Sequence, residues 1–128
     1  MKRSRLAVLL MTLALSLSSA MPVLAETGWV YNGSAWNYYH ADGHMGKTQW
    51  IKNGDSMFWL KEDGSMAANE WHQDGETWYW LDGSGVAATG WVEIDGKWYY
   101  FFEDHHMASD ETINSRYVGK DGAWDTSK

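Results

Sequence analysis

The chain of 128 residues contains no cysteine and a single proline, Pro22. Without cysteine there is neither a disulfide framework nor a thiolate, which excludes disulfide-stapled mini-proteins, cysteine-ligated zinc fingers and cysteine hydrolases. Positive charge is also scarce, because ten Lys and Arg stand against seventeen Asp and Glu, for a net charge of −7. A surface that binds phosphate through bulk positive charge is therefore not expected, and nucleic acid is not a predicted partner.

Aromatic residues are abundant instead, with ten Trp, seven Tyr and three Phe. A chain of this length makes one small domain at most, and an ordinary core of that size needs far fewer rings. The rings therefore need an explanation beyond core packing.

Residues 1–25 have the features of a secretory signal peptide. A basic start is followed by an uncharged apolar run over residues 6–17, and small residues precede Glu26. The alternative is an uncleaved anchor, because residues 6–25 carry no charge and are just long enough to span a bilayer. Several serines and Pro22 within this run favour cleavage after Ala25. Cleavage removes three basic residues and no acidic one, so the net charge becomes −10 and the product is predicted to be secreted.

The remainder is a repeat of about 20 residues. A leading tryptophan recurs at steps of 21, 21 and 20 residues, as Trp29, Trp50, Trp71 and Trp91. The second position follows seven residues later, as Trp36, Met57, Trp78 and Trp98. The third position is two residues further on, as Tyr38, Trp59, Trp80 and Tyr100. The methionine position lies nine residues after the second, as Met45, Met66, Ala87 and Met107. We assign four repeats to residues 26–109.

Two turn signals divide each repeat. The first is a turn pair at Asn32-Gly33, Asn53-Gly54, Asp74-Gly75 and Asp95-Gly96, the strongest local signal for a hairpin with a type I′ turn. The fourth copy carries an extra residue, Ile94, which predicts a loop of another length. The second turn lies at Asp42-Gly43, Asp63-Gly64, Ser84-Gly85 and Asp104-His105. Histidine tolerates the left-handed conformation better than most residues, so a turn at His105 remains plausible.

Each repeat is therefore predicted to be one hairpin. Residues two apart share a strand face, so the second and third positions lie together, while the residue between them points the other way. A lone hairpin is marginal in water and has no interior, so the repeats must stack. The predicted fold is all-β, a solenoid of stacked β-hairpins.

Residues 110–128 resemble half of a repeat. Tyr117 falls at the third position and Trp124 at the methionine position, whereas Ser115 replaces the second tryptophan. This tail is predicted to complete the last site between repeats, to cap the last hairpin, or to do both.

These motifs carry a resemblance. Thr89-Gly90-Trp91, followed by residues 95–101 and by Met107-Ala108, resembles the cell wall-binding repeat of the choline-binding protein family. The family resemblance covers residues 27–124. It implies a left-handed β-solenoid whose aromatic pockets hold choline groups of teichoic or lipoteichoic acid on the bacterial cell wall.

The resemblance also implies the pocket residues. A pocket takes the leading and second positions of one repeat, the third position of the next, and often the methionine between. The first two sets would be Trp29, Trp36, Met45 and Trp59, and then Trp50, Met66 and Trp80, with Met57 in place of the second tryptophan. The others would be Trp71, Trp78 and Tyr100, with Ala87 at the methionine position, and then Trp91, Trp98, Met107 and Tyr117.

The chemistry suits such a ligand. A quaternary ammonium cannot donate an N–H hydrogen bond, so aromatic faces hold it, each contributing ~0.5–2 kcal/mol. Several weak sites on one protein gain affinity for a polymer through avidity. The net charge of −10 after cleavage favours a cation and opposes the polymer's phosphates.

Other interpretations remain open. The same rings could serve only as packing between hairpins. They could stack neutral sugars, with polar neighbours such as Asn37, Asn69, Gln73 and Glu93 binding hydroxyls. The protein could also associate with itself, for example as a homodimer, or with another surface protein. No catalytic motif is present and the histidines lie at turns, so neither an enzyme, nor a metal site, nor a cofactor is predicted.

The predicted faces generate a first test. Trp98→Ala is expected to weaken retention on immobilised choline more than Tyr99→Ala does, because only Trp98 faces the pocket in this assignment. Equal losses would contradict the assignment of faces.

Overall fold

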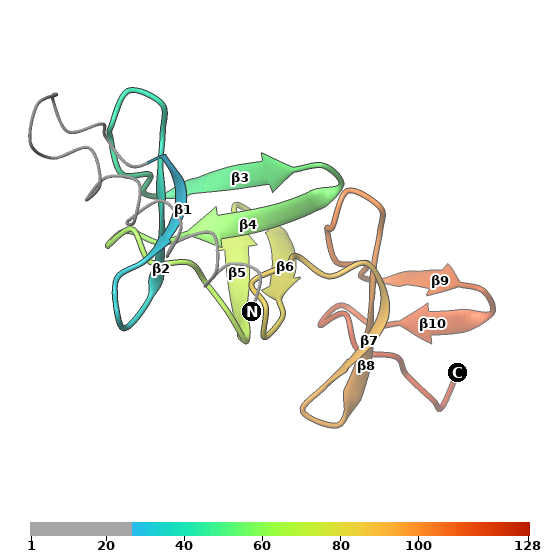
Figure 1. The fold of residues 1–128 in the computed structure, drawn as a ribbon. Helices are drawn as coiled ribbons and strands as arrows, with labels where there is room; N and C mark the ends of the chain where they lie inside the picture. The colour runs from blue at the N-terminus through green and yellow to red at the C-terminus, as the bar shows by residue number, and fades with distance from the viewer. Residues whose placement is uncertain (1–26) are drawn as a thin grey trace, which may run out of the picture. The chain divides into compact units, whose positions relative to one another are not determined.

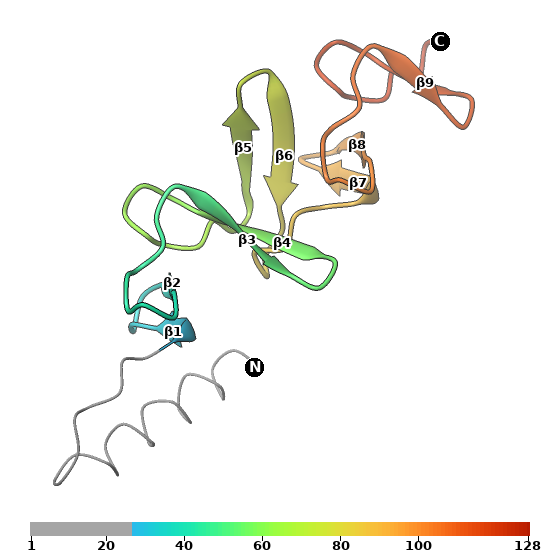
Figure 2. The same ribbon diagram turned by 90° about the horizontal axis from the view of Figure 1, so that it is seen from above.

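The computed structural model describes residues 27–128, and in this range it contains ten β-strands and no helix. The predicted signal segment, residues 1–25, lies outside the described residues. The strands are β1 (Gly28–Tyr31), β2 (Trp36–Tyr39), β3 (Gln49–Asn53), β4 (Ser56–Leu60), β5 (Glu70–Asp74), β6 (Thr77–Leu81), β7 (Gly90–Ile94), β8 (Lys97–Phe101), β9 (Glu111–Ile113) and β10 (Arg116–Val118). Each pairs with its neighbour in sequence as a two-stranded sheet, which confirms the all-β hairpin fold (Figures 1 and 2).

The chain divides into two compact units. Among the described residues, the first unit holds residues 27–53 and Phe58–Ala67, with the β1–β2 hairpin and most of β3–β4. The second holds Gly54–Met57 and Ala68–Lys128, with the hairpins β5–β6, β7–β8 and β9–β10. Among the described residues, none forms a helix with the length and apolar character that a membrane crossing requires.

Main-chain hydrogen bonds join consecutive hairpins within each unit. In the second unit, the N–H of Met107 donates to the carbonyl of Trp78 in the preceding hairpin at 2.9 Å, and the N–H of Ala108 donates to Tyr100 of its own hairpin at 2.8 Å. The bond to the preceding hairpin recurs from Met66 to Trp36 at 2.9 Å in the first unit, and from Ala87 to Met57 at 2.9 Å and Trp124 to Trp98 at 2.8 Å in the second. Within each unit the hairpins therefore stack in sequence order, as predicted for a solenoid of hairpins.

Stacked hairpins meet front to back. We call the face that carries the leading and third positions the front, because Trp71 lies directly opposite Trp80, and Trp91 opposite Tyr100. In the second unit the ring of Tyr99, on the back of β8, packs against Trp71 on the front of the preceding hairpin, with ring centroids 5.0 Å apart. Each interface thus combines two different sets of residues.

The hydrophobic core is thin and lies at these interfaces. In the second unit Phe101 is fully buried and clusters with Ala88 and Ile94, and partly buried side chains that include Trp71 and Met107 pack against them. Stability in such an arrangement comes mainly from contacts between neighbouring repeats rather than from one central core.

The first turn of each repeat differs from the predicted type I′ turn in most copies. In the β7–β8 loop both Asp95 (φ 51°) and Gly96 (φ 83°) have positive φ, as a type I′ turn requires. In the β5–β6 loop Asp74 is the last strand residue, and the loop is Gly75 (φ 64°) and Glu76, with positive φ at Gly75 alone, the signature of a type II′ turn.

The expected change of loop length falls in a different copy. The loops of the second, third and fourth hairpins all contain two residues, whereas residues 32–35 form a longer loop in the first. Ile94 does not lengthen the loop of the fourth copy: it takes the last position of β7, the position that Asp74 holds in β5, so both residues of the Asp95-Gly96 pair lie in the turn.

His105 takes the left-handed conformation that its glycine counterparts use, with φ 77°. Glycine at this turn lies against the methionine position of the preceding repeat: a Cβ on Gly122 would lie 2.4 Å from the Sδ of Met107. His105 instead meets the repeat in which that position is Ala87, and its Nδ1 lies 3.2 Å from the Ala87 carbonyl oxygen. The imidazole is buried at 9% exposure. Ala87 and His105 are therefore matched departures from the repeat, since the small side chain makes room for the large one.

This match predicts a coupled pair of substitutions. Ala87→Met should destabilise the protein by about 1–3 kcal/mol, because the longer side chain overpacks against His105. Adding His105→Gly should recover most of that loss, because it restores the methionine–glycine pair of the other repeats. Urea unfolding of the two single variants and the double variant measures the coupling, and simple additivity of the two losses would contradict the match.

Candidate functional site

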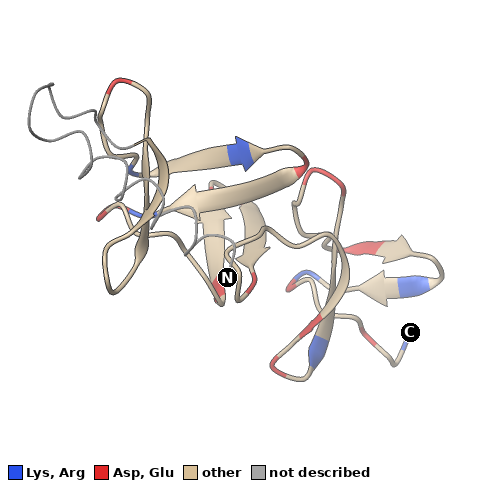
Figure 3. Ribbon diagram, viewed as in Figure 1, with Lys and Arg blue, Asp and Glu red and all other residues tan. Residues whose placement is uncertain are grey.

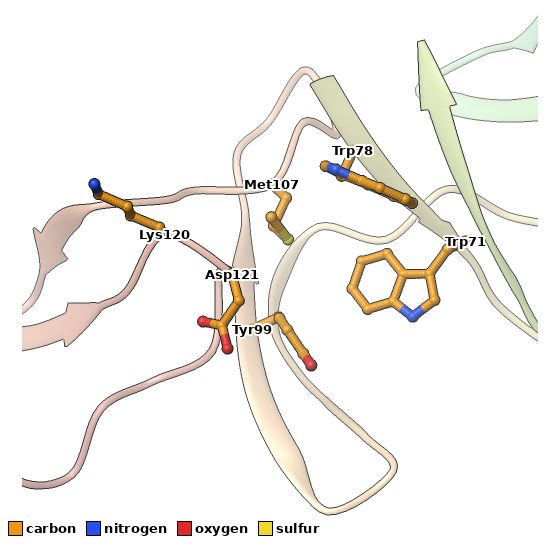
Figure 4. Close-up of a pocket in the computed structure, with 6 residues that line it drawn as sticks. All are labelled: Trp71, Trp78, Tyr99, Met107, Lys120 and Asp121. Atoms are coloured by element: carbon orange, nitrogen blue, oxygen red, sulfur yellow. The ribbon is translucent and has the colours of Figure 1, made fainter. Parts of the chain in front are cut away.

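A cavity of about 220 Å³ opens between consecutive hairpins of the second unit, lined by Trp71, Trp78, Tyr99, Met107, Lys120 and Asp121. We call it the Trp71 cavity (Figure 4). Trp71 and Trp78 come from the front of β5–β6, and Tyr99 comes from the back of β8. The main-chain N–H of Met107 donates to the carbonyl of Trp78, and this bond sets the position of Met107 in the cavity wall.

The rings stand at steep angles to one another. Trp71 and Trp78 have centroids 6.0 Å apart with planes at 88°, and Trp71 and Tyr99 are 5.0 Å apart at 75°. Rings in this arrangement present faces and edges toward a shared space rather than stacking flat and closing it. Trp78 remains 37% exposed, so one of its faces is open to a ligand.

Charge lies at the rim of this cavity. Figure 4 shows the Asp121 carboxylate beside Tyr99 and the Lys120 ammonium turned away from the rings. Burial, and then the negative charges of Asp121 and Asp95, raise the pKa of Tyr99 above its ordinary value of 10.0, so its ring is uncharged at neutral pH. Acidic residues elsewhere lie mostly at turns and hairpin ends (Figure 3). The cavity thus offers neutral aromatic and thioether walls with an acidic neighbour.

A second cavity of about 340 Å³, the Trp91 cavity, is lined by Trp91, Trp98, Arg116 and Trp124. The rings of Trp91 and Trp124 are 6.3 Å apart with planes at 57°, and Trp98 is 41% exposed. The guanidinium carbon of Arg116 lies over both rings, 5.8 Å from the Trp91 centroid and 5.2 Å from the Trp124 centroid. Here the chain itself places a cation against the aromatic walls.

Both cavities follow one register. Each takes the leading and second positions of one repeat, the back residue of the next second strand (Tyr99 or Arg116), and the next methionine position (Met107 or Trp124). The first unit repeats two parts of this geometry: Trp29 packs against Phe58 at 5.1 Å, and the N–H of Met66 bonds to the Trp36 carbonyl. Trp29, Trp36, Phe58 and Met66 are therefore the equivalent set of the first unit.

The structure brings some of the predicted site residues together and separates others. Trp71 and Trp78 share one cavity, and Trp91 and Trp98 share the other. Tyr100 lies instead against Trp91 in its own hairpin, with centroids 5.2 Å apart.

Two residues predicted for the last site also lie elsewhere. Met107 lines the Trp71 cavity rather than the Trp91 cavity. The Tyr117 hydroxyl donates to the Asp110 carboxylate, and Lys128 lies over the Tyr117 ring at 5.4 Å. The neighbouring residue Arg116 occupies the wall predicted for Tyr117.

The two predicted sets nearer the N-terminus are also rearranged. In the first set Trp59 packs on Trp50 at 5.2 Å, and Met45 lies against the position that a Cβ on Gly64 would occupy, 2.7 Å from its Cε. The second set draws on both units: Trp50 and Met66 belong to the first, and Met57 and Trp80 to the second, where Trp80 packs on Trp71 at 5.3 Å.

One physical reason explains these differences. The prediction joined the fronts of two consecutive hairpins, whereas hairpins that stack in the same orientation must meet front to back. The back residues Tyr99 and Arg116, the rim residues Lys120 and Asp121, and Trp124 were therefore missed. The alternation along β8 already placed Tyr99 opposite to Trp98 and Tyr100, and a front-to-back stack would have identified it. The expected contrast between Trp98→Ala and Tyr99→Ala loses its basis, since each residue lines a cavity.

Among the described residues, no group of three His, Asp or Glu side chains converges on a position that could hold a metal ion. The histidines lie mainly at turns, where His44 pairs with Asp42 and His106 pairs with Asp104.

Comparison with known proteins places these cavities in a family context. Residues 71–111 match the model of the choline-binding repeat, and residues 48–66 match that of a cell wall binding repeat. The fold is similar to choline binding protein F of Streptococcus pneumoniae (TM-score 0.71, 36% identity, 79% of this chain and 34% of that chain). No curated protein sequence matches the chain.

Two further structures are similar. One is the multimodular pneumococcal cell wall endolysin from phage Cp-1 complexed with choline (TM-score 0.61, 26% identity, 74% of this chain and 29% of that chain). The other, truncated alternansucrase of Leuconostoc mesenteroides, shares the fold (TM-score 0.69, 23% identity, 79% of this chain and 10% of that chain). The present chain spans about a third of the length of choline binding protein F.

The raised pKa of Tyr99 gives a test of the cavity geometry. Asp121→Asn should lower this pKa toward its ordinary value, because it removes one of the negative charges that oppose ionisation, while burial continues to raise it. Tyr79 is the internal control, since its pKa is raised by burial, Asp74 and Asp104. NMR titration of labelled tyrosine measures both groups, and an equal change at Tyr79 and Tyr99 would contradict a local effect.

Since folding raises these pKa values, the free energy of unfolding should fall as the pH rises above about 10.

Proposed function

The repeats of this chain belong to the choline-binding, cell wall-binding repeat family, and on that premise we propose that the Trp71 cavity binds choline groups of teichoic or lipoteichoic acid. The protein is a cell wall-binding module, and the proposal concerns its ligand and its site. The observation that carries it is the set of three rings at steep angles, Trp71, Trp78 and Tyr99, with the Met107 side chain as a further wall.

The chemistry of these walls supports a quaternary ammonium. Such a cation needs no hydrogen-bond acceptor, and each aromatic face contributes ~0.5–2 kcal/mol through its quadrupole. The neutral ring of Tyr99 and the polarisable thioether of Met107 suit N-methyl groups. The Asp121 carboxylate at the rim adds attraction for a positive charge at longer range.

The relatives support the same ligand class. The phage Cp-1 endolysin is described in complex with choline, and choline binding protein F has been crystallised in the presence of a peptidoglycan analogue. What those proteins bind becomes a proposal for the present chain because their repeats resemble its own.

The repeat would also provide avidity. The set Trp29, Trp36, Phe58 and Met66 repeats the register of the Trp71 cavity in the first unit, and a polymer offers many choline groups. Weak sites that engage one polymer together gain apparent affinity through effective concentration. This role requires the protein to reach the cell wall, which fits secretion through the predicted signal peptide.

Sugar binding is less well supported by the polar residues that were considered for it. The Asn37 side chain is 6% exposed, and its amide donates to the Gly64 carbonyl at 2.9 Å while its oxygen accepts from Asn32 at 2.9 Å. Its hydrogen-bonding groups are thus engaged within the protein. Gln73 and Glu93 lie opposite Trp78 and Trp98 across their hairpins, so a glycan arm belongs in the test.

The proposal predicts that Trp78→Ala weakens choline binding. Loss of one ring should raise the dissociation constant about 2- to 30-fold, the equivalent of ~0.5–2 kcal/mol. Isothermal titration calorimetry with choline chloride measures this change. Phe102→Ala is the matched control, since Phe102 packs on Tyr100 and His106 and lines neither cavity, and it should bind as the wild type does.

Two results would count against choline as the ligand. One is an absence of heat and of a change in tryptophan fluorescence at saturating choline. The other is retention of the protein on a soluble glucan that depends on Trp78, which would favour the carbohydrate-binding alternative.

A further inference from the structure

We propose that Arg116 is a built-in occupant of the Trp91 cavity that excludes free cations, so that in the second unit only the Trp71 cavity accepts a quaternary ammonium. This inference rests on the proposed function and assigns a specificity-determining role to one residue. It follows from the contrast between two cavities that share a register but differ in two of their walls.

The guanidinium already occupies the place that a ligand cation would take. It lies over the Trp91 and Trp124 rings at 5.8 and 5.2 Å from their centroids, within the ~6 Å reach of a cation–π contact. A planar guanidinium stacks on aromatic faces and stays charged at every working pH. A ligand cation must therefore displace Arg116 from these rings or bind beside it.

Both routes are unfavourable for a cation. Binding beside Arg116 brings two positive charges to contact distance, where their repulsion offsets the attraction of one or two rings. Displacement loses two cation–π contacts that the protein makes without any entropy of association. In the Trp71 cavity the equivalent wall is the neutral ring of Tyr99, and the charges of Lys120 and Asp121 lie at the rim, with the ammonium turned away from the rings and the carboxylate beside Tyr99.

The walls of the Trp91 cavity fit this role together. Arg116 begins β10 at the register of Tyr99, and Trp124 stands at the methionine position, where it adds a large ring face. The two exchanges, tyrosine to arginine and methionine to tryptophan, match each other, because the introduced ring stacks with the introduced guanidinium. The pair therefore provides an internal contact in place of an open site.

Site-resolved NMR separates the two cavities. The indole N–H resonances of Trp78 and Trp98 are followed while choline chloride is added to the wild type and to Arg116→Gln. In the wild type the Trp78 resonance should shift until choline saturates the Trp71 cavity, and the Trp98 resonance should not shift. In Arg116→Gln the Trp98 resonance should also saturate, with an affinity for choline at least on the order of 10-fold higher than in the wild type. Lys120→Gln is the matched control: it removes the same charge beside the other cavity and should leave Trp98 unresponsive.

Each contrary outcome has a distinct meaning. A saturating shift of the Trp98 resonance in the wild type overturns the inference about Arg116 alone. So does a Trp98 resonance that does not shift with choline in Arg116→Gln while the Trp78 resonance does. Silence of both indoles in every variant overturns the proposed function and this inference with it. Phosphocholine that shifts Trp98 in the wild type, with the shift lost in Arg116→Gln, overturns the occupant role in favour of phosphate binding by Arg116. Arg116 is exposed, so its substitution should leave the fold intact. An unchanged response of the Trp78 resonance to choline in Arg116→Gln verifies that this variant is folded.

Discussion

The structure depends on one recurring interaction, the main-chain hydrogen bond from the methionine position of one repeat to the second position of the repeat before it. A thin hairpin has no interior, so its stability must come from a neighbour, and this bond sets how neighbours meet. It aligns the front of one hairpin with the back of the next. The same alignment leaves a gap bordered by rings from two repeats, so the interaction that holds the fold together also creates the cavities.

Stacking through neighbours explains why departures from the repeat occur in pairs. His105 replaces a glycine where the preceding methionine position is Ala87, and Arg116 replaces an aromatic residue where the next methionine position is Trp124. His105 and Ala87 lie across an interface from each other, in different repeats, whereas Arg116 and Trp124 belong to the same half repeat and meet in the wall of one cavity. A substitution in one repeat therefore changes the demands on the adjacent one, and repeats of the same register acquire different chemistry.

The aromatic residues serve packing and site formation at once. Trp71 contacts Trp80 within its hairpin and Tyr99 across the interface, while another part of its ring borders the cavity. Acidic residues lie mostly at turns and hairpin ends, where water solvates them, and the aromatic and thioether walls of the Trp71 cavity are neutral. The proposed binding of a quaternary ammonium relies on this separation, because the cation would meet neutral ring faces while acidic residues attract it from nearby.

The sequence by itself determined the repeat, the hairpins and the need for stacking, because turn residues and strand alternation are local properties that each copy displays. The resemblance to the choline-binding family also implied that Trp71 pairs with Trp78 and Trp91 with Trp98, and each pair lines one cavity. Only the tertiary structure decided which partners complete those sites, because front-to-back contact depends on the orientation of one hairpin relative to the next, and spacing within a repeat carries no record of that orientation. Tyr99 and Arg116 entered the walls for this reason, and Tyr100 and Tyr117 were left on the fronts of their own hairpins.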